Sequence, residues 1–467
     1  MPAAQQRVNT DPEPFPGWAL LAGRVNRRPP ELPLLASVDV LVVGGGASGV
    51  AAATTSAELG HTTLLVEKYG FCGGAAVAGM SGTICGLYLA HDTPTVPQQV
   101  VFGFAQRFRE GLERRGGLTA PQRYGKTFTV THDPLVWRET ADDLLTAAGV
   151  RVLFHTSLTG VVVEGNVVRG VVLDSNAGRG VVLASRVVDA SGDAAVLARG
   201  GFRYRFGDTG QIQNPTMFFR LGQVDRDRFL DYWGDDTICP AKVSELIDTA
   251  AESGSYDLPR RKIWIFPSPR PGELLVNATR LTATDGRMLN VIDPADFTEA
   301  ELNGRRQVRH YARFLADHIP GLAHSFVVDT GVEAGIRQTR TAYGVATLTA
   351  ADVVAARKSP DTICRSPWPI ELHAGSRPKL EWLLEDYYDV PFATLVPETA
   401  ENLIMAGRSL SADHEALASA RVTAQCFEYG HAAGVAVALS IDTDTAVRDL
   451  PVDKIQAVMR QRGSALG

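Results

Sequence analysis

The sequence predicts an α/β fold in which a nucleotide-binding domain is interrupted by an α+β substrate domain. Three observations lead to this prediction. Residues 38–50 form an apolar stretch that runs into a GxGxxG turn and a run of small residues. The same succession of apolar strand, glycine and alanine-rich helix returns over residues 402–440. Between these segments, residues 206–330 are richer in aromatic and charged side chains, which indicates an inserted domain.

The glycine turn has the features that a bound dinucleotide requires. Gly44 permits a tight turn out of the strand, Gly46 lets the backbone approach a pyrophosphate, and Gly49 lets the helix lie close to the strand. The diphosphate is then expected at the helix N-terminus, where Ser48 lies and where unpaired N–H groups favour an anion. Glu67 ends the next apolar run, so its carboxylate can accept hydrogen bonds from the adenosine ribose.

Further elements are predicted in chain order. Residues 1–37 are rich in proline and are expected to form an arm or tail, in which Trp18 would contact the body or the partner subunit of a homodimer. The small residues at 70–79 indicate close approach of the backbone to a ligand. An amphipathic helix is predicted for residues 133–148, because a proline opens the segment and a glycine follows it. Strands are predicted for residues 150–155, 158–163, 167–174 and 181–188.

These elements divide the chain into domains. Residues 38–205 are the first part of the nucleotide-binding domain, and residues 331–440 are its return segment. Residues 206–330 would form the substrate or cap domain, with a predicted helix at 299–318. Residues 441–467 are expected to form a C-terminal tail.

Two further motifs favour FAD over NAD as the dinucleotide. One predicted strand ends in Ala-Ser-Gly at 190–192, which resembles the Ala-Thr-Gly motif of glutathione-reductase-type flavoproteins. The segment 399–407 resembles the late strand of that superfamily, whose terminal glycine meets the ribityl chain of FAD. Arg408 stands where an aspartate is usual, which puts contact between a carboxylate and the ribityl chain in doubt. Together the motifs imply a glutathione-reductase-type FAD-binding Rossmann domain.

A closer resemblance covers residues 38–440. The sequence is similar to the FAD-dependent oxidoreductases whose bacterial members are often labelled xanthan-lyase-like, and the similarity lies in residues 70–74, 214–220, 277–280, 331–340 and 406–422. The resemblance implies that a helix beginning near Ala420 points its N-terminus at the flavin, where it would stabilise negative charge on the reduced ring. Cys72 departs from the leucine that is more common. The cofactor-binding residues implied are Gly44, Gly46, Ser48, Gly49, Glu67, Lys68, Gly73, Gly74, Ala75, Leu158, Ala190, Ser191, Gly192, Gly407, Arg408, Arg421 and Val422.

Histidines and arginines are the candidates for substrate chemistry. His414 is the first choice for acid–base catalysis or substrate orientation, because it lies between the ribityl-contacting strand and the flavin-facing helix and has an ordinary pKa near ~6.5. His91 is a weaker candidate, since it could equally lie in a surface loop. Arg337, Arg340 and Arg220 could clamp a carboxylate or another polar substrate group, or they could be structural arginines.

The cysteines do not favour disulfide-reductase chemistry. Cys72 and Cys85 stand thirteen positions apart, whereas reductases of this superfamily carry a CxxxxC pair. Cys72 is therefore interpreted first as a small packing residue and second as a reactive thiol. No motif has the spacing of metal ligands, so no metal is expected.

The leading hypothesis is an FAD-dependent dehydrogenase or oxidase that takes a hydride from a small polar metabolite at a CH–OH, CH–NH or CH–CH bond. The sequence contains no second strand-linked GxGxxG to bind NADPH, so the substrate is expected to reduce the flavin, and oxygen or an external carrier to reoxidise it. Two alternatives stay open. One is a flavin monooxygenase that binds NAD(P)H transiently, and the other is a non-catalytic flavoprotein that serves as a scaffold or redox sensor.

The composition argues against some partners. With 467 residues, 45% of them hydrophobic, the chain can bury a large core, and its net charge of -6 gives no electrostatic footprint for nucleic acid. No apolar run approaches the roughly 20 residues that cross a bilayer. The first 28 residues lack the apolar stretch of a signal peptide, and the five cysteines are scattered. These features predict a cytoplasmic protein that binds neither nucleic acid nor membranes.

Overall fold

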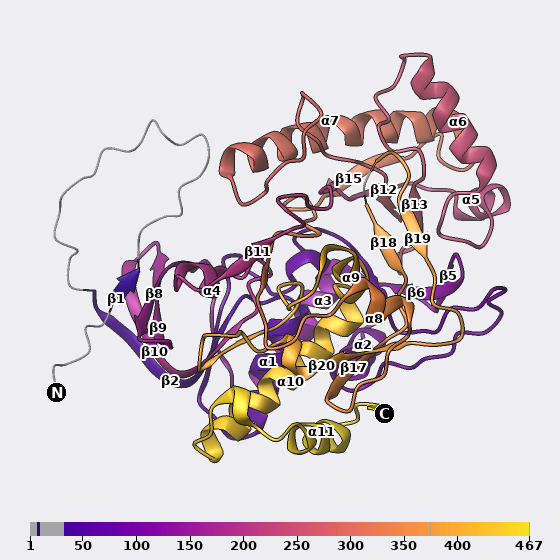
Figure 1. Cartoon of the computed structure of the whole chain (residues 1–467). Coiled ribbons are helices and arrows are strands. Elements are labelled where there is room, and N and C mark those ends of the chain that lie inside the picture. Colours follow the sequence, from indigo (N-terminus) through magenta and orange to yellow (C-terminus); the bar gives the residue numbers. More distant parts are fainter. Residues whose placement is uncertain (1–6, 10–31, 374, 467) are drawn as a thin grey trace.

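The computed structural model describes residues 7–9, 32–373 and 375–466. Two parts are visible in Figure 1: a lower α/β part built on a largely parallel sheet, and an upper part with an antiparallel sheet and three helices. The chain enters the upper sheet at residue 219, leaves it at residue 330, and returns to the lower sheet near residue 403. The predicted fold class, an α/β domain with an inserted domain, is confirmed.

The lower sheet has a parallel centre and an antiparallel flank. Its strand order is β1-β8-β9-β10-β2-β3-β7, and β21 pairs with the last residues of β10. The pairs β10–β2, β2–β3, β3–β7 and β10–β21 are parallel, whereas β8, β9 and β1 continue the sheet with antiparallel pairs. The strands are β1 (Arg7–Asn9), β2 (Leu34–Val43), β3 (Thr63–Val66), β7 (Arg151–Leu153), β8 (Ser157–Glu164), β9 (Val167–Ser175), β10 (Gly178–Asp189) and β21 (Leu403–Met405).

The four strands predicted between residues 150 and 188 are confirmed as β7 to β10. The first strand of the sheet differs from its prediction, because β2 begins at Leu34 rather than at Val38. The reason is that residues 34–38 pair with the first half of β10, which extends the sheet into the end of the predicted arm. Residues 1–6 and 10–31 of that arm lie outside the described residues.

Two helices of small residues cross on one face of the sheet. α1 (Ala47–Glu58) and α10 (Thr423–Asp442) touch so closely that a Cβ atom at Gly430 would lie 2.0 Å from the Ser48 carbonyl oxygen. The Ser48 hydroxyl also donates a hydrogen bond to the Cys426 carbonyl at 2.7 Å. Small side chains thus let the two backbones come into contact, and this contact fixes the distance between the two helices.

A second core holds the upper part together. Its four-stranded antiparallel sheet has the order β13-β14-β12-β15, and its apolar side packs against the buried Tyr311 and Phe314 of α7. The predicted helix at 299–318 is confirmed but begins earlier, because the Asp293 side chain caps α7 by accepting from the Ala295 amide. The elements are β12 (Phe219–Gly222), β13 (Trp264–Pro267), β14 (Leu274–Asn277), β15 (Phe326–Thr330), α5 (Arg226–Trp233), α6 (Ala241–Glu252) and α7 (Pro294–His318).

The hairpin of β18 (Ile370–Leu372) and β19 (Lys379–Glu381) lies against the upper sheet in Figure 1. It belongs to the return segment of the chain, yet it contacts the upper part through a 3.2 Å hydrogen bond from the Asn214 amide to the His373 carbonyl. It also packs the His373 ring 6.2 Å from the ring of Trp264. The hairpin therefore helps to close the space between the two parts.

The remaining elements complete the lower part and the connections. The predicted helix at 133–148 is confirmed as α3, and the expected C-terminal tail contains α11, whose Ile455 and Met459 are buried. These elements are η2 (Gly74–Ala76), β4 (Thr83–Ile84), α2 (Phe104–Arg114), β5 (Gln122–Tyr124), β6 (Thr127–Thr131), α3 (Pro134–Ala147), α4 (Ala195–Arg199), β11 (Tyr204–Phe206), β16 (Arg340–Ala342), α8 (Ala350–Val354), β17 (Thr362–Ser366), β20 (Tyr388–Pro391), η3 (Phe392–Thr394), α9 (His414–Ala420), η4 (Val447–Asp449) and α11 (Val452–Gln461).

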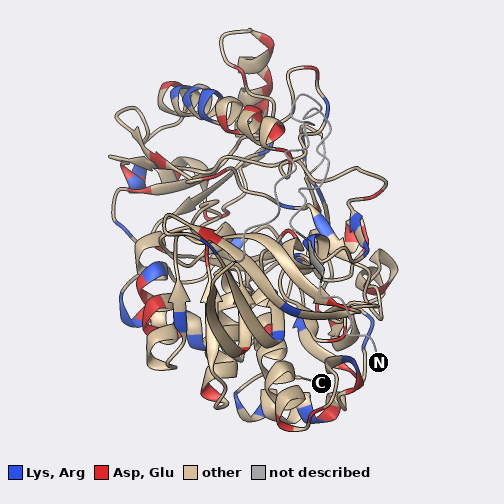
Figure 2. Cartoon of the chain, turned by 90° about the vertical axis from the view of Figure 1, so that its left-hand side faces the viewer, with Lys and Arg blue, Asp and Glu red and all other residues tan. Residues whose placement is uncertain are grey.

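Charges of both signs are interspersed over the face seen in Figure 2, with basic side chains gathered on α7. Among the described residues, none of the helices is both long and apolar enough to span a bilayer. The same residues contain no group of three histidine, cysteine or acidic side chains that could hold a metal ion.

Candidate active site

A long cavity starts at the C-terminal ends of the parallel strands and continues beneath the upper sheet. At the strand ends it is lined by Gly44 after β2, Glu67 after β3, Ala190 after β10 and Gly407 after β21. In open α/β sheets, ligands bind at this edge of the sheet. The walls at the other end come from the upper part and from the β18–β19 hairpin, and they include Thr216, Phe218, Phe266, Asn277, Glu371 and His373.

The GxGxxG turn has the geometry of a phosphate cradle. Gly44 has a φ of +103°, and a Cβ atom there would lie 2.5 Å from the Ala190 carbonyl oxygen. A Cβ at Gly49 would lie 1.8 Å from the Gly44 carbonyl oxygen, so this position packs the helix on the turn. Gly46 is the N-cap of α1 and provides no side-chain cap, so the first N–H groups of the helix are left for another acceptor. The turn therefore fits the pyrophosphate of a dinucleotide.

Glu67 has a structural role that the sequence did not indicate. Its side chain is buried, and its two oxygens accept from the Gly45 amide at 2.7 Å and from the Tyr69 amide at 2.9 Å. Burial raises the pKa of Glu67, and the two amide hydrogen bonds oppose that rise. Each carboxylate oxygen can accept more than one hydrogen bond. Ribose binding by Glu67 stays a prediction, and the carboxylate in addition holds the glycine turn in place.

The small-residue segment after Glu67 packs directly on the glycine turn. The Gly73 amide donates to the Gly45 carbonyl at 2.8 Å, and a Cβ at Gly74 would lie 3.0 Å from the Gly46 Cα. Cys72 is fully buried beneath this contact, outside the cavity lining, and burial raises the pKa of its thiol. Its packing position favours the interpretation of Cys72 as a small filling residue.

Arg408, which occupies the position where the superfamily pattern has an aspartate, forms an ion pair. The guanidinium of Arg408 binds Asp193 with an Nη2–Oδ1 distance of 2.7 Å, and both residues line the cavity. A Cβ at Gly192 would lie 2.9 Å from the guanidinium carbon, so this glycine, with a φ of +78°, makes room for the pair. A carboxylate is thus present beside Arg408, but it is supplied by the segment after β10.

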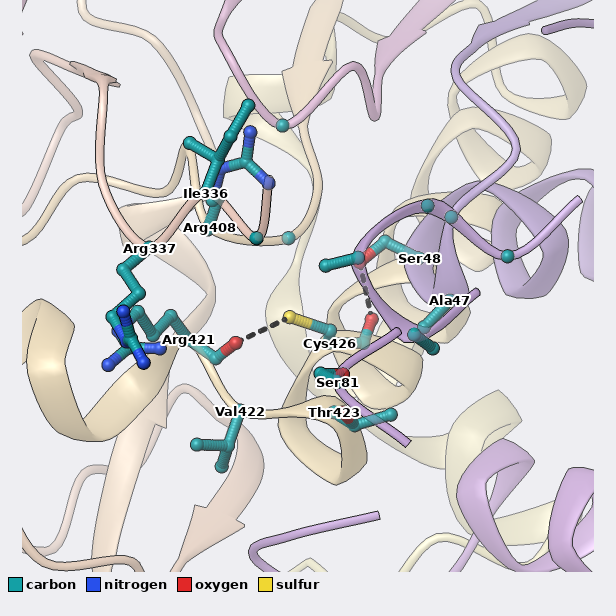
Figure 3. Close-up of a pocket in the computed structure, with 18 of the residues that line it drawn as sticks. Ala47, Ser48, Ser81, Ile336, Arg337, Arg408, Arg421, Val422, Thr423 and Cys426 are labelled. Carbon is teal, nitrogen blue, oxygen red and sulfur yellow. Dashed lines mark hydrogen bonds between the residues drawn. The ribbon is translucent and has the colours of Figure 1, made fainter. Parts of the chain in front are cut away.

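The N-terminus of α10 faces the same cavity. Val422 is the N-cap without a side-chain cap, and Val422 and Thr423 both line the cavity (Figure 3). The helix predicted from about Ala420 is α10, which begins at Thr423 because Val422 takes an extended conformation with a ψ of 163°. The short helix α9, which ends at Ala420, was not predicted. The free N–H groups at this end can stabilise negative charge in a bound ligand.

The histidine candidates lie outside the cavity lining. His414 is the first residue of α9, where its Nδ1 atom is buried without a hydrogen-bond partner among the described residues. Burial lowers the pKa of His414. His91 lies 3.7 Å from Glu385, which is a contact near the surface. His414 does not line the cavity, so a role at the flavin stays a prediction.

The three candidate arginines have different surroundings. Arg337 is buried, lines the cavity, and donates from Nη1 to the Asn214 carbonyl at 2.6 Å. Arg340 lies outside the lining, where its Nη1 donates to the Asp193 carbonyl at 3.3 Å. Arg220 is held in the upper sheet by Asp329, at 2.9 and 2.7 Å, and by Glu273 at 3.1 Å. These ion pairs of Arg220 are structural, and of the three arginines only Arg337 reaches the cavity.

Most of the expected cofactor-binding residues are brought together. Apart from Gly49, which packs the turn, and Leu158, which lies in β8 against the core of the lower sheet, the candidates line one cavity. They are Gly44, Gly46, Ser48, Glu67, Lys68, Gly73, Gly74, Ala75, Ala190, Ser191, Gly192, Gly407, Arg408, Arg421 and Val422.

A polar group that sequence reasoning missed lies at the opposite end of the cavity. The Tyr124 hydroxyl donates to Glu371 Oε1 at 2.7 Å, and His373 Nε2 lies 3.2 Å from the same oxygen. All three side chains are buried and line the cavity. Glu371 and His373 stand two positions apart on an extended segment, which puts them on one face. This two-residue spacing was the sequence feature that could have indicated the pair, but a strand of three residues is too short to be recognised from periodicity.

The charges around this group are set by burial and by arginines. Burial by itself raises the pKa of Glu371, but His373, Tyr124 and Arg421 outweigh it and lower the pKa, so the carboxyl is ionised. Burial and the nearby Arg337 lower the pKa of His373, so its imidazole is neutral at pH 7. The group therefore presents a carboxylate and a neutral imidazole side by side.

Comparisons with known proteins agree with this geometry. The family model described as FAD dependent oxidoreductase matches residues 39–459. No curated protein sequence matches the chain. A geranylgeranyl bacteriochlorophyll reductase-like protein from Thermoplasma acidophilum has a similar structure, with a TM-score of 0.51 and 17% identity over 91% of this chain and 84% of that one. At this identity, the likeness shows the fold alone.

Two other solved structures are similar over most of their length at lower scores. The p-nitrophenol 4-monooxygenase of Pseudomonas putida has a TM-score of 0.44 and 12% identity over 91% of this chain and 81% of that one. The L-proline dehydrogenase of P. horikoshii has a TM-score of 0.43 and 14% identity over 92% of this chain and 99% of that one.

Proposed function

Since the chain belongs to the FAD-dependent oxidoreductase family, with FAD as its cofactor, we propose that it oxidises a small polar metabolite bound beneath the upper sheet. The observation that supports this most is the continuity of the cavity. It runs from the phosphate turn at Gly44–Gly49 to a chamber lined by Phe218 and Phe266, with Glu371 and His373 in its wall. When bound, FAD supplies two-electron redox chemistry. The chain itself provides an apolar enclosure with a few polar groups, as small-molecule sites do.

The residues have separate roles in this proposal. The N-terminus of α1 holds the pyrophosphate, Glu67 the ribose, and the N-terminus of α10 the negative charge of the reduced ring. Aromatic residues of the upper sheet exclude water from the chamber. The bond that is oxidised would be CH–OH, CH–NH or CH–CH, and oxygen or an external carrier would reoxidise the cofactor.

Anaerobic mixing tests the proposal. Purified holoenzyme is mixed with a panel of small polar metabolites, and bleaching of the visible absorption of the oxidised flavin is followed in time. A dehydrogenase or oxidase is expected to be bleached by its substrate alone. Rapid bleaching by NADPH alone, with labelled oxygen recovered in product, would instead establish the monooxygenase alternative. No bleaching by any compound would support the non-catalytic alternative. The cytoplasmic location and the homodimer stay predictions.

A further inference from the structure

Three arginines gather around the chamber, of which Arg260 and Arg337 are buried and Arg421 is half-buried. Arg337 and Arg421 line it, and in Figure 3 their side chains lie beside each other. Burial lowers the pKa of Arg337, and the positive charges of Arg260 and Arg421 lower it further. Arg260 lies behind the wall, 2% exposed, with its guanidinium 4.3 Å from the ring centroid of Trp264. Like charges this close in a buried place repel each other unless an anion separates them.

The hydrogen bonds of these arginines go to neutral oxygens. Arg337 donates to the Asn214 carbonyl at 2.6 Å, Arg421 to Gln213 Oε1 at 3.0 Å, and Arg260 to Asn277 Oδ1 at 2.6 Å. One nitrogen of Arg260 and the Nε of Arg421 are buried without a partner among the described residues. The donors of the cluster therefore exceed the acceptors that the chain provides.

The carboxylates of the cavity do not balance this charge. Glu67 holds the glycine turn, Asp193 pairs with Arg408, and Glu333 pairs with Lys68 at 2.9 Å. Only Glu371 is left to face the three arginines, so the chamber carries about two positive charges in excess. A buried charge without a counter-charge is costly, so a bound anion would stabilise this cluster.

We propose that the substrate of this enzyme carries a carboxylate, and that this carboxylate binds between Arg337 and Arg421 with His373 beside it. The inference rests on the proposed oxidation, whose substrate class it narrows to small carboxylic acids. Arginine presents its N–H groups in a fork that matches a carboxylate, which makes the fit specific for this group. Arg421, which the family resemblance assigns to the cofactor, lies where the cofactor end of the cavity and the chamber meet.

His373 has the position of a proton acceptor next to this subsite. Its Nε2 atom faces Glu371 Oε1, so that nitrogen carries the proton, and the carboxylate fixes the ring orientation. Its Nδ1 atom makes no hydrogen bond with the described residues and is left to accept a proton from the substrate. The charged groups that act on the ring are Arg337, Glu371 and Arg260, while Tyr124 and Arg421 act on Glu371.

Redox-inert probes test the anion site without turnover. The holoenzyme is titrated with acetate, propionate and benzoate and with the neutral acetamide, propionamide and benzamide, and binding is read from the flavin absorption spectrum and from the unfolding temperature. At least one acid is expected to bind, with its amide binding roughly 10- to 100-fold more weakly, which is the value of a charge-assisted hydrogen bond. Equal binding of acids and amides, or no binding of any acid, would overturn the inference.

Arginine variants locate the site. Arg337→Gln is expected to weaken binding of the acid by roughly 10- to 100-fold and to leave the amide unchanged. Arg337→Lys keeps the positive charge but lacks the two-pronged N–H geometry of the guanidinium, so it should recover part of the affinity for the acid. Such a recovery would show that the loss in Arg337→Gln does not come from misfolding. Arg220→Gln is the matched control, because Arg220 belongs to the upper sheet but lies outside the cavity lining. Wild-type affinity for the acid in a folded Arg337→Gln variant would refute the assignment.

The pH dependence of probe binding separates His373 from a purely structural residue. An anion at Arg337 removes the cation that lowers the pKa of His373, so the bound state has the higher pKa and binding takes up a proton. Within the pH range in which benzoate stays ionised, its affinity is therefore expected to be higher at the acidic end and to fall as the pH rises through the pKa of His373 in the complex. His373→Gln should bind benzoate without this dependence. The same slope in His373→Gln would contradict the role of the imidazole.

The two proposals fail in different ways. If an acid binds through Arg337 but no oxidisable carboxylic acid bleaches the flavin, the anion site stands and the oxidation fails. If a substrate without a carboxylate bleaches the flavin and the acids do not bind, the oxidation stands and the anion site fails.

Discussion

Asp193 and Arg408 show how one pair of side chains can change the electrostatics of a cofactor site. Asp193 accepts from Arg408 Nη2 and from the Thr339 hydroxyl, both at 2.7 Å. Burial raises the pKa of Asp193, but Arg408 and Thr339 outweigh this effect and lower the pKa below its ordinary value. The carboxylate is therefore ionised at neutral pH, and its side chain is 30% exposed, toward the cavity that both residues line.

Replacing Asp193 by Asn should destabilise the protein at neutral pH by roughly 1 to 3 kcal/mol, between the values for exposed and buried pairs. A lowered folded-state pKa gives stability that is present above the unfolded pKa and is lost as the pH falls through the folded one. The variant should therefore lose less stability than wild type on acidification. Urea unfolding of the FAD-free protein at neutral and acidic pH measures both effects, with Asp174→Asn, at an exposed position of β9, as the control. If the variant and the wild type lost the same stability on acidification, the Asp193–Arg408 pair would not be the cause of the acid sensitivity.

At the scale of elements, the crossing of α1 and α10 links the two ends of the cofactor site. The N-terminus of α1 lies at the phosphate turn, and that of α10 lines the cavity nearer the chamber. Cβ atoms at Gly430 and Gly434 would lie 2.0 and 2.7 Å from carbonyl oxygens of α1. Because backbone rather than flexible side chain occupies this space, the distance between the helices depends on these two glycines.

Gly430→Ala is expected to destabilise the protein by about 1 to 3 kcal/mol, as overpacking does, and to weaken FAD binding. The sign of the stability change tests the contact, because Gly→Ala inside a helix otherwise stabilises the protein by about 0.5 to 1 kcal/mol. Gly304→Ala in α7 is the matched control, since the three atoms nearest to its Cβ all belong to the Met217 side chain rather than to the backbone. Thermal unfolding and FAD titration of both variants provide the measurement. A stabilised Gly430→Ala variant would show that the helices can separate without cost.

The elements also show which features a sequence reveals. The glycine turn, the strands of the lower sheet and α3 were predictable because local patterns of turn residues and period determine them. The break between α9 and α10 was not, because no glycine or proline marks it and Val422 is extended only in its tertiary setting. Glu371 and His373 were missed for two reasons. Their strand has only three residues, and the cavity that they line forms only when the upper part packs against this hairpin. The structural alternative for Arg220 could not be recognised from the sequence, because its partner Asp329 lies 109 positions away.

At the scale of the whole molecule, the cavity joins segments that are far apart in the chain. Its lining comes from residues 44 to 85, Tyr124 and residues 190 to 193 of the first part, from 216 to 277 of the upper part, and from 333 to 426 of the return segment. The lower and upper parts have separate apolar cores. A ligand that fills the whole cavity therefore contacts both parts, whereas a ligand that fills only the phosphate end contacts the lower part.

ADP and FAD should for this reason protect different regions from amide hydrogen exchange. ADP, which occupies only the turn at the strand ends, is expected to slow exchange at residues 44–49 and 190–193. FAD should also slow exchange at residues 422–426 and 335–337. It should slow exchange near Thr216 of the upper part as well, because a ligand that orders both ends of the cavity couples the two cores. Exchange mass spectrometry on the apoprotein with saturating ADP or FAD makes the comparison, and α11, far from the lining, is the internal control. If FAD protected no more than ADP does, the ring would not reach the chamber, and the chamber beneath the upper sheet could not be the place of oxidation.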